Sequence, residues 1–241
     1  MHPSLAEASA VLFDLDGVLT PTAEVHRRAW ARTFETVFAA LGVAEPYADA
    51  DYFAWLDGKA RYEGVAALLA SRGVRLPWGT PTDLPGAESV CGIGNLKNAA
   101  FTAVLAEAGV AAYPGSVALL AALETAGVPC AVVSSSRNAR PVLSAAGLGE
   151  RFPVVVDGQY SAEHALAGKP APDGFLEAAR LLGAAPERAV VIEDALSGVA
   201  AGAAGGFGLV VGVDRGAGAA ALAAAGADLV VADLADLMGG A

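Results

Sequence analysis

Cysteine is scarce in this chain, which has only Cys91 and Cys130 among 241 residues. The two do not have the spacing of paired metal ligands, and they are too few for a disulfide scaffold. Sparse cysteine is typical of a reduced intracellular protein, and no basic segment followed by an apolar core stands before Ser9. We therefore expect no signal peptide and a cytoplasmic location.

Positive charge is also in short supply, since 15 lysines and arginines face 26 aspartates and glutamates and leave a formal net charge of −11. A surface with this excess repels the phosphates of nucleic acids and of anionic lipids. We expect neither nucleic acid nor a membrane as a partner. An anionic substrate would need cations that are placed locally.

A long apolar run without interruption is missing as well. Residues 195–213 carry no charge over the length of a membrane span, but six glycines and Ser197 interrupt them. A helix, a turn and a buried strand fit this stretch better than a membrane span. With 55% hydrophobic residues the chain can still build one large or two modest globular domains, and we expect a monomer.

The chain does have a regular alternation of short Val, Ile and Leu runs with helical patterns. The expected strands are 11–13, 128–133, 154–156, 189–192, 209–213 and 229–231, and the expected helices between them are 116–126, 139–146, 173–182, 196–204 and 219–225. Because these strands are apolar throughout, they predict an α/β fold with an open, doubly wound parallel sheet that is covered on both faces.

This alternation is interrupted between residues 21 and 112. Helical patterns follow one another there without a convincing strand, over residues 22–41, 52–56, 62–71 and 89–108. We therefore expect an inserted α-helical cap domain at 21–112 and a core domain made of 1–20 and 113–241. We expect the Pro- and Gly-rich stretch 76–86 to be a simple connection between cap helices, since nothing in it carries phosphate chemistry.

Two carboxylates, Asp14 and Asp16, follow the first expected strand in the run VLFDLDG that starts at Val11. Taking a carboxylate out of water is costly unless a cation or hydrogen bonds compensate it. Mg²⁺ prefers carboxylate oxygens, with substrate phosphate and water completing its shell. The run therefore predicts a magnesium site or a shared chemical task, although a solvated junction between a strand and a turn would use the same residue types.

Polar residues also stand where ligands bind in a doubly wound sheet, beyond the carboxyl ends of the strands. Ser134 ends one strand, and a hydroxyl followed by helix-start amides can bind phosphate or simply cap the helix. Glu193 and Asp194 end another strand, so one acid would bind a cation directly and the other through water. Lys169 stands among prolines, either as a fixed cation for a phosphoryl group or as a solvated surface lysine.

Together these segments resemble the four motifs of the haloacid dehalogenase superfamily of phosphotransferases, in family order and across nearly the whole core. The resemblance implies that Asp14 is the nucleophile that becomes an aspartyl phosphate and that Asp16 is the general acid and base. It implies that Lys169 neutralises charge at the nucleophile and that Ser134, the matching residue of the second motif, completes the catalytic set Asp14, Asp16, Lys169 and Ser134. The implied cofactor is Mg²⁺, with the ligand set Asp14, Asp16, Glu193 and Asp194.

The cap segments resemble the beta-phosphoglucomutase-like branch of that superfamily. The helix after the first motif carries His26, and the segments GKAR and NLKN carry Arg61 and Lys97. The resemblance implies contacts with a small phosphorylated sugar, because Arg suits a distal phosphate bidentately. Each of the three could instead have a structural role, as a packed histidine or a solvated charge. The implied substrate-binding set is His26, Arg61, Lys97, Ser135 and Asn138, next to Ser134 in the core.

Three functions are compatible with these residues. The first is a Mg²⁺-dependent sugar-phosphate mutase that interconverts beta-glucose 1-phosphate and glucose 6-phosphate, and the cationic cap residues favour it. The second is a phosphatase of the same fold that admits water to the aspartyl phosphate. The third is a nonenzymatic module that keeps only the scaffold, which the complete set of catalytic residue types disfavours.

Overall fold

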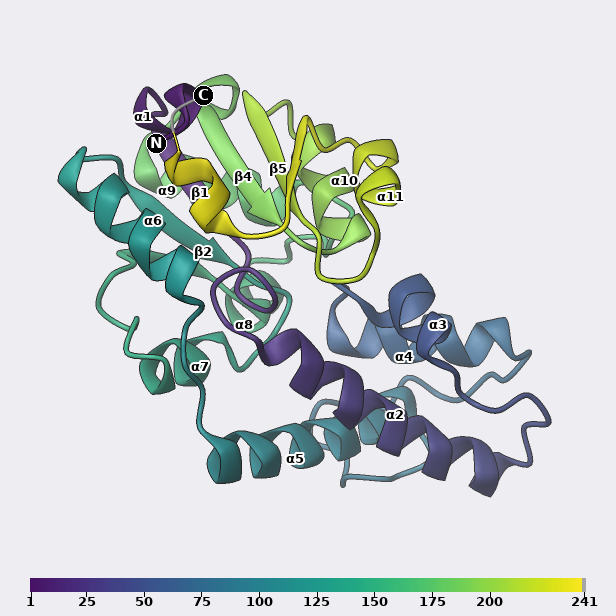
Figure 1. Ribbon diagram of the computed structural model, residues 1–241. Coiled ribbons are helices and arrows are strands. Elements are labelled where there is room, and N and C mark those ends of the chain that lie inside the picture. The colour runs from purple at the N-terminus through teal and green to yellow at the C-terminus, as the bar shows by residue number, and fades with distance from the viewer. Residues whose placement is uncertain (240–241) are drawn as a thin grey trace. The chain divides into compact units, whose positions relative to one another are not determined.

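The computed structural model describes residues 1–239, except for the side chains of residues 107 and 108 (Figure 1). The chain divides into two compact units, one with residues 1–21 and the chain from Val110 onward, the other Thr22–Gly109. These bounds differ slightly from those expected for the core and the cap. The last two residues of the expected core, 240 and 241, lie outside the described part.

A six-stranded parallel sheet lies at the centre of the first unit, with the strand order β3-β2-β1-β4-β5-β6. Every residue of β1, β2 and β4 is buried, as expected for apolar strands that are covered on both faces. The predicted class, an α/β fold with a doubly wound parallel sheet, is confirmed. The strands are β1 (Ala10–Phe13), β2 (Cys130–Val133), β3 (Val154–Val156), β4 (Ala189–Glu193), β5 (Leu209–Val213) and β6 (Leu229–Val231).

The α-helices of the first unit begin and end close to the predicted residues, and two short helices were not predicted. α1 and α8 have four and six residues, too few to show a helical period. In α8 the side chain of Asp157 caps the first turn by accepting from the amides of Gln159 and Tyr160. The helices are α1 (Pro3–Ala6), α6 (Pro114–Thr125), α7 (Ala139–Ala145), α8 (Gly158–Glu163), α9 (Asp173–Leu182), α10 (Leu196–Ala204) and α11 (Ala219–Ala224), with 3-10 turns at Pro186–Arg188 and Leu234–Met238.

Alternate strand residues bury opposite faces of the sheet. Leu12 and Val191 share one buried cluster with Phe175 of α9 and Val199 of α10. Phe13, which points to the other face, is also fully buried. Within residues 195–213 the chain forms α10, a turn and β5, as the glycines predicted, and no helix in the described part of the chain is long and apolar enough to cross a membrane.

The second unit is helical throughout its described secondary structure. Its core contains aromatic side chains from one face of α2, among them Trp30, Phe34 and Phe38, together with Leu68 and Ile93. An amphipathic helix buries such a stripe against its neighbours. The elements are α2 (Thr22–Leu41), α3 (Asp49–Asp51), a π-helical turn (Tyr52–Leu56), α4 (Arg61–Ser71) and α5 (Val90–Ala108).

The loop over residues 76–86 is hydrogen-bonded to the start of α5. Asp83 accepts from Ser89 at 2.5 Å and from Thr80 at 2.8 Å, and these two bonds lower the pKa of the Asp83 carboxyl below its ordinary value. The Asn95 amide donates to the carbonyls of Asp83 and Pro81. These bonds support the expected role of the loop as a connection that belongs to the second unit.

The sheet order places polar residues at one edge. β1 lies between β2 and β4, where the strand order changes direction, and ligands of doubly wound sheets bind beyond the carboxyl ends of strands at such a point. Asp14 follows β1, Ser134 follows β2 and Asp194 follows β4. The topology therefore explains why residues far apart in the chain form one candidate site.

Candidate active site

The segment after β1 is a tight turn. The Asp14 amide continues the pairing with β4 by donating to the Ile192 carbonyl at 2.9 Å. The amides of Leu19 and Thr20 then both donate to the carbonyl of Leu15, and the Gly17 amide donates to Thr20 at 2.7 Å. These bonds fix the backbone that carries Asp14 and Asp16.

Gly17 is required in this turn for two reasons. Its φ of 91° lies in the region that favours glycine. A Cβ at this position would also collide with the carboxylate of Asp194. The close approach brings Asp194 directly over the turn after β1, so the acids of the first and fourth motifs meet there.

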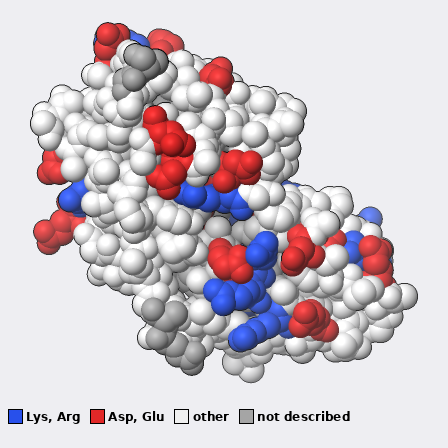
Figure 2. Space-filling view, viewed as in Figure 1, with Lys and Arg blue, Asp and Glu red and all other residues white. Residues whose placement is uncertain are grey.

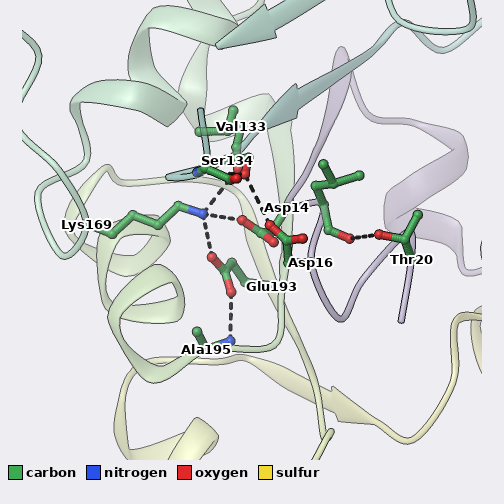
Figure 3. Close-up of polar contacts among 10 residues, drawn as sticks. Asp14, Asp16, Thr20, Val133, Ser134, Lys169, Glu193 and Ala195 are labelled. Atoms are coloured by element: carbon green, nitrogen blue, oxygen red, sulfur yellow. Dashed lines mark hydrogen bonds and ion pairs between the residues drawn. The ribbon is translucent and has the colours of Figure 1, made fainter. Parts of the chain in front are cut away.

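Lys169 lies between two buried acids (Figure 3). Its Nζ is 2.5 Å from Oδ1 of Asp14 and 2.6 Å from Oε1 of Glu193, and it donates to the Val133 carbonyl at 3.1 Å. The lysine is only 6% exposed, so it is not a solvated surface lysine, which was the alternative to a fixed cation. It binds one oxygen of the predicted nucleophile and neutralises part of the local negative charge.

Glu193 is fully buried, and both of its carboxylate oxygens have partners. Oε1 accepts from Lys169, and Oε2 accepts from the Ala195 amide at 2.7 Å. A Cβ at Gly198 would collide with this carboxylate, so the start of α10 also encloses it. The geometry gives Glu193 the task of holding Lys169, and its predicted part in metal binding stays a prediction.

The charges of the site explain two pKa shifts. Burial raises the pKa of Asp14 well above its ordinary value, and Lys169 opposes this while Glu193 and Asp16 add to it. Burial would lower the pKa of Lys169, but attraction to Asp14 and Glu193 prevails and raises it. One ammonium thus binds the carboxylates of Asp14 and Glu193, and the Asp16 carboxylate adds to the negative charge that acts on Asp14. An additional cation would relieve the remaining repulsion.

The turn after β2 carries the second predicted motif. The Ser134 hydroxyl is 3.5 Å from Oδ2 of Asp16 and accepts from the Ser136 amide at 3.1 Å (Figure 3). The Ser136 hydroxyl in turn accepts from the Asn138 amide at 3.1 Å. Ser135 and Asn138 therefore lie in a turn that is built by hydroxyls, beside Asp16. The part of Ser136 in this turn was missed in the sequence analysis, although the run of three serines contained it.

The three predicted cap residues lie in the second unit. Lys97 is 3% exposed, contacts Nδ1 of His26 and lies 4.9 Å from the ring centroids of both Trp30 and Phe101. Lys97 is therefore buried against aromatic rings, where a cation is attracted to the ring faces. Arg61 donates to Oδ1 of Asn98 at 2.7 Å. The structure brings His26 and Lys97 together and places Arg61 beside the residue that follows Lys97.

The donor chemistry of the core site suits Mg²⁺. Asp14, Asp16 and Asp194 offer hard carboxylate oxygens. Among the described residues no three or more His, Cys, Asp and Glu side chains are arranged to hold a metal ion by themselves. Mg²⁺ is usually held by one or two carboxylates with phosphate and water, so this arrangement fits an ion that binds together with a phosphorylated substrate.

The doubly wound domain carries a lysine-bound aspartate at the switch point, as the resemblance to the haloacid dehalogenase superfamily implied. The family described as haloacid dehalogenase-like hydrolase matches residues 8–206, and the chain belongs to this family of enzymes. The likeness that the four motifs predicted is confirmed.

Curated relatives include phosphosugar mutases and phosphatases. A beta-phosphoglucomutase from Mycobacterium bovis is 48% identical over 95% of this chain and 91% of the relative. Hexitol phosphatase A from Escherichia coli is 32% identical over 81% of this chain and 78% of the relative.

Solved structures with the same fold include a beta-phosphoglucomutase from Clostridium difficile, with a TM-score of 0.76 and 26% identity over 95% of this chain and 93% of that one. CbbY from Rhodobacter sphaeroides in complex with phosphate has a TM-score of 0.70 and 32% identity over 95% of this chain and 96% of that one. A mutant of CbbY has also been solved in complex with xylulose-(1,5)bisphosphate.

Replacement of Lys169 by Met should lower the free energy of unfolding by about 3–5 kcal/mol near pH 8 without divalent cations, because Asp14 and Glu193 would then be buried without a cation. The pKa of Asp14 is already raised by burial and would rise further. The folded variant would then bind a proton more tightly than the unfolded chain, so the loss should be smaller at a pH of about 5 than near pH 8.

Urea unfolding in EDTA at the two pH values measures this effect. Arg151→Met is the control, since it removes a positive charge from an exposed side chain that precedes β3, at the opposite end of the sheet from the site. A loss in Lys169→Met that is no larger than in the control, or that is equal at both pH values, would contradict the account.

Proposed function

We propose that the protein is a Mg²⁺-dependent phosphotransferase that works through an aspartyl phosphate on Asp14, and that it acts as a beta-phosphoglucomutase. The observation that carries the proposal is the buried contact of Lys169 with Asp14, beside Asp16 and Ser134. It supplies a nucleophile, a neutralising cation and a group that can move a proton, which are the parts that phosphoryl transfer needs.

The proposed first step uses the residues as the structure arranges them. Because Lys169 binds Oδ1 of Asp14, Oδ2 is the oxygen that we propose attacks phosphorus. The bond from phosphorus to the sugar oxygen breaks, and Asp16 gives its proton to that oxygen. Bound Mg²⁺, with Asp14, Asp16, Glu193 and Asp194 as the proposed ligand set, would offset charge on the phosphoryl oxygens.

The second step decides between the two candidate functions. In a mutase a sugar hydroxyl gives its proton to Asp16 and attacks the aspartyl phosphate, which frees Asp14. In a phosphatase water does the same. The mutase is supported by the 48% identical beta-phosphoglucomutase relative and by the predicted cap residues His26, Arg61 and Lys97. The phosphatase is the second candidate because Hexitol phosphatase A is also a relative.

We propose that the substrate is a small phosphorylated sugar. In this proposal the enzyme interconverts beta-glucose 1-phosphate and glucose 6-phosphate through their bisphosphate. The proposed contacts in the core are Ser134, Ser135 and Asn138, at the turn after β2. On the face shown in Figure 2, several basic groups lie directly beside acidic groups, and the rest of the face is largely uncharged. We propose a monomer in the cytoplasm.

Asp194→Asn should raise the Mg²⁺ concentration that gives half-maximal activity at least about tenfold, because it removes one negative charge and one strong ligand oxygen from the end of β4, beside Gly17. Activity measured against Mg²⁺ concentration gives this value. The matched control is Glu150→Gln, an exposed acid ahead of β3. If Asp194→Asn and the control require the same Mg²⁺ concentration, Asp194 is not a ligand.

Arg61→Ala should lower transfer to sugar much more than transfer to water. We propose that Arg61 binds the distal phosphate of the bisphosphate, and loss of a charge-assisted contact costs about 1.5–3 kcal/mol of binding free energy. The measurement is the ratio of glucose 6-phosphate to free phosphate formed from beta-glucose 1-phosphate with trace bisphosphate, at saturating Mg²⁺.

Arg28→Ala is the control for this ratio, because Arg28 lies in the same unit and its side chain is 62% exposed. A wild type that forms only free phosphate, together with an Arg61→Ala variant that hydrolyses substrate equally well, would exclude the mutase and leave the phosphatase.

A further inference from the structure

Arg215 contacts the turn after β1 although it lies outside all four motifs. It stands just after β5, and its Nε donates to the carbonyl of Gly17 at 2.9 Å. Its Nη1 donates to the Ala232 carbonyl at 3.0 Å, and its Nη2 is 3.7 Å from the carboxylate of Asp233. The guanidinium therefore joins the turn to the segment that follows β6.

Three successive carbonyls of this turn accept from the body of the first unit. Gly17 accepts from Arg215, Val18 accepts from the Ser116 hydroxyl at 2.7 Å, and Leu19 accepts from the Tyr113 amide at 2.9 Å. The guanidinium carbon of Arg215 also lies 4.1 Å from the ring centroid of Tyr113. Arg215 supplies the charged donor of the three and packs on the residue that supplies another.

The other parts of Gly17 are also held in place. Its amide donates to Thr20, its φ is 91°, and the Asp194 carboxylate occupies the space where a side chain would be. The remaining polar group of Gly17 is its carbonyl, which Arg215 holds. The Arg215 side chain is 22% exposed, so this charge-assisted hydrogen bond is largely shielded from water.

We propose that Arg215 is a positioning residue for phosphoryl transfer: by holding the Gly17 carbonyl it fixes the backbone that carries Asp16. The Gly17 carbonyl belongs to the peptide unit shared with Val18, and the Gly17 amide belongs to the unit shared with Asp16. The two units meet at the Gly17 Cα, so the bond from Arg215 to the carbonyl and the bond from the amide to Thr20 together hold the backbone on the C-terminal side of Asp16. Displacement of a reacting group by about 1 Å can cost about 100-fold in rate. This inference rests on the proposed role of Asp16 and holds for either a mutase or a phosphatase.

The test compares Arg215→Met with Arg215→Lys and with the exposed control Arg151→Met. The probe is para-nitrophenyl phosphate, because its hydrolysis reports on Asp14 and Asp16 without a sugar acceptor. Arg215→Met should lower kcat by about 100-fold and change KM by less than about threefold, because it disturbs the reacting group and not the binding of phosphate. Arg215→Lys, which keeps a cation beside the Gly17 carbonyl, should recover part of kcat.

Hydrogen exchange read by mass spectrometry follows the same contact without turnover. In Arg215→Met, amides of residues 15–20 should exchange faster while those of β1 and β4 stay protected. Unchanged exchange of the turn, or a kcat per folded molecule equal to that of Arg151→Met, would overturn the proposal. A wild type without turnover would instead reject the proposed function, and the exchange result would still decide whether Arg215 holds the turn. If Arg215→Met does not fold, Arg215→Lys is read in the same way, with a smaller loss of kcat expected.

Discussion

The arrangement of the site depends on the bonds that the Lys169 ammonium makes. The ammonium binds Asp14 after β1, the Val133 carbonyl at the end of β2 and Glu193 at the end of β4. These three strands are neighbours at the centre of the sheet. One buried cation therefore holds together the carboxyl ends of three strands and two buried acids, Asp14 and Glu193.

Burial strengthens the attraction between the Lys169 ammonium and the acids, and it also removes the water that hydrates these charges. A buried ion pair stabilises little compared with an apolar core, because both charges lose their water. In this site burial raises the pKa of Asp14, and the neighbouring acids Glu193 and Asp16 raise it further while Lys169 opposes them. Such a site is arranged for binding and chemistry more than for stability, since a cation and a phosphoryl group can supply the missing interactions when substrate binds.

The surrounding backbone is as constrained as the charged groups. Gly17 and Gly198 leave space for the carboxylates of Asp194 and Glu193, which a methyl group at either position would fill. Both glycines belong to the motifs of the family. Each stands where a neighbouring carboxylate leaves no room for a side chain. The second unit repeats the use of a buried cation, since Lys97 lies against His26 and two aromatic rings.

Much of the fold and the core site could be predicted from the sequence, because the signals are local. Apolar runs that end in Asp14, Ser134 or Asp194 show both a strand and its functional end. The contacts of Arg215 could not be predicted in this way, since Gly17 lies 198 residues from it and Arg215 lies outside the motif that contains Gly17. An arginine in a Gly-rich loop after a buried strand was the only signal.

Side-chain pairing was also beyond local reasoning. Glu193 was predicted as a partner of the metal, which stays a prediction, but its bonds to Lys169 and to the Ala195 amide were not predicted. His26 and Lys97 were predicted as separate contacts, and they meet because α2 and α5 pack together in the second unit. Such pairings depend on helix packing and on the sheet order, which a pattern of residue types does not specify.

The central claim is that Asp14 receives the phosphoryl group. The direct measurement is acid quenching of the wild type during turnover of beta-glucose 1-phosphate, followed by mass spectrometry of its peptides, with Asp14→Asn as the control. The account predicts one added phosphoryl group on Asp14 in the wild type and none in the variant. A phosphoryl group on another residue, or turnover by Asp14→Asn at the wild-type rate, would contradict it.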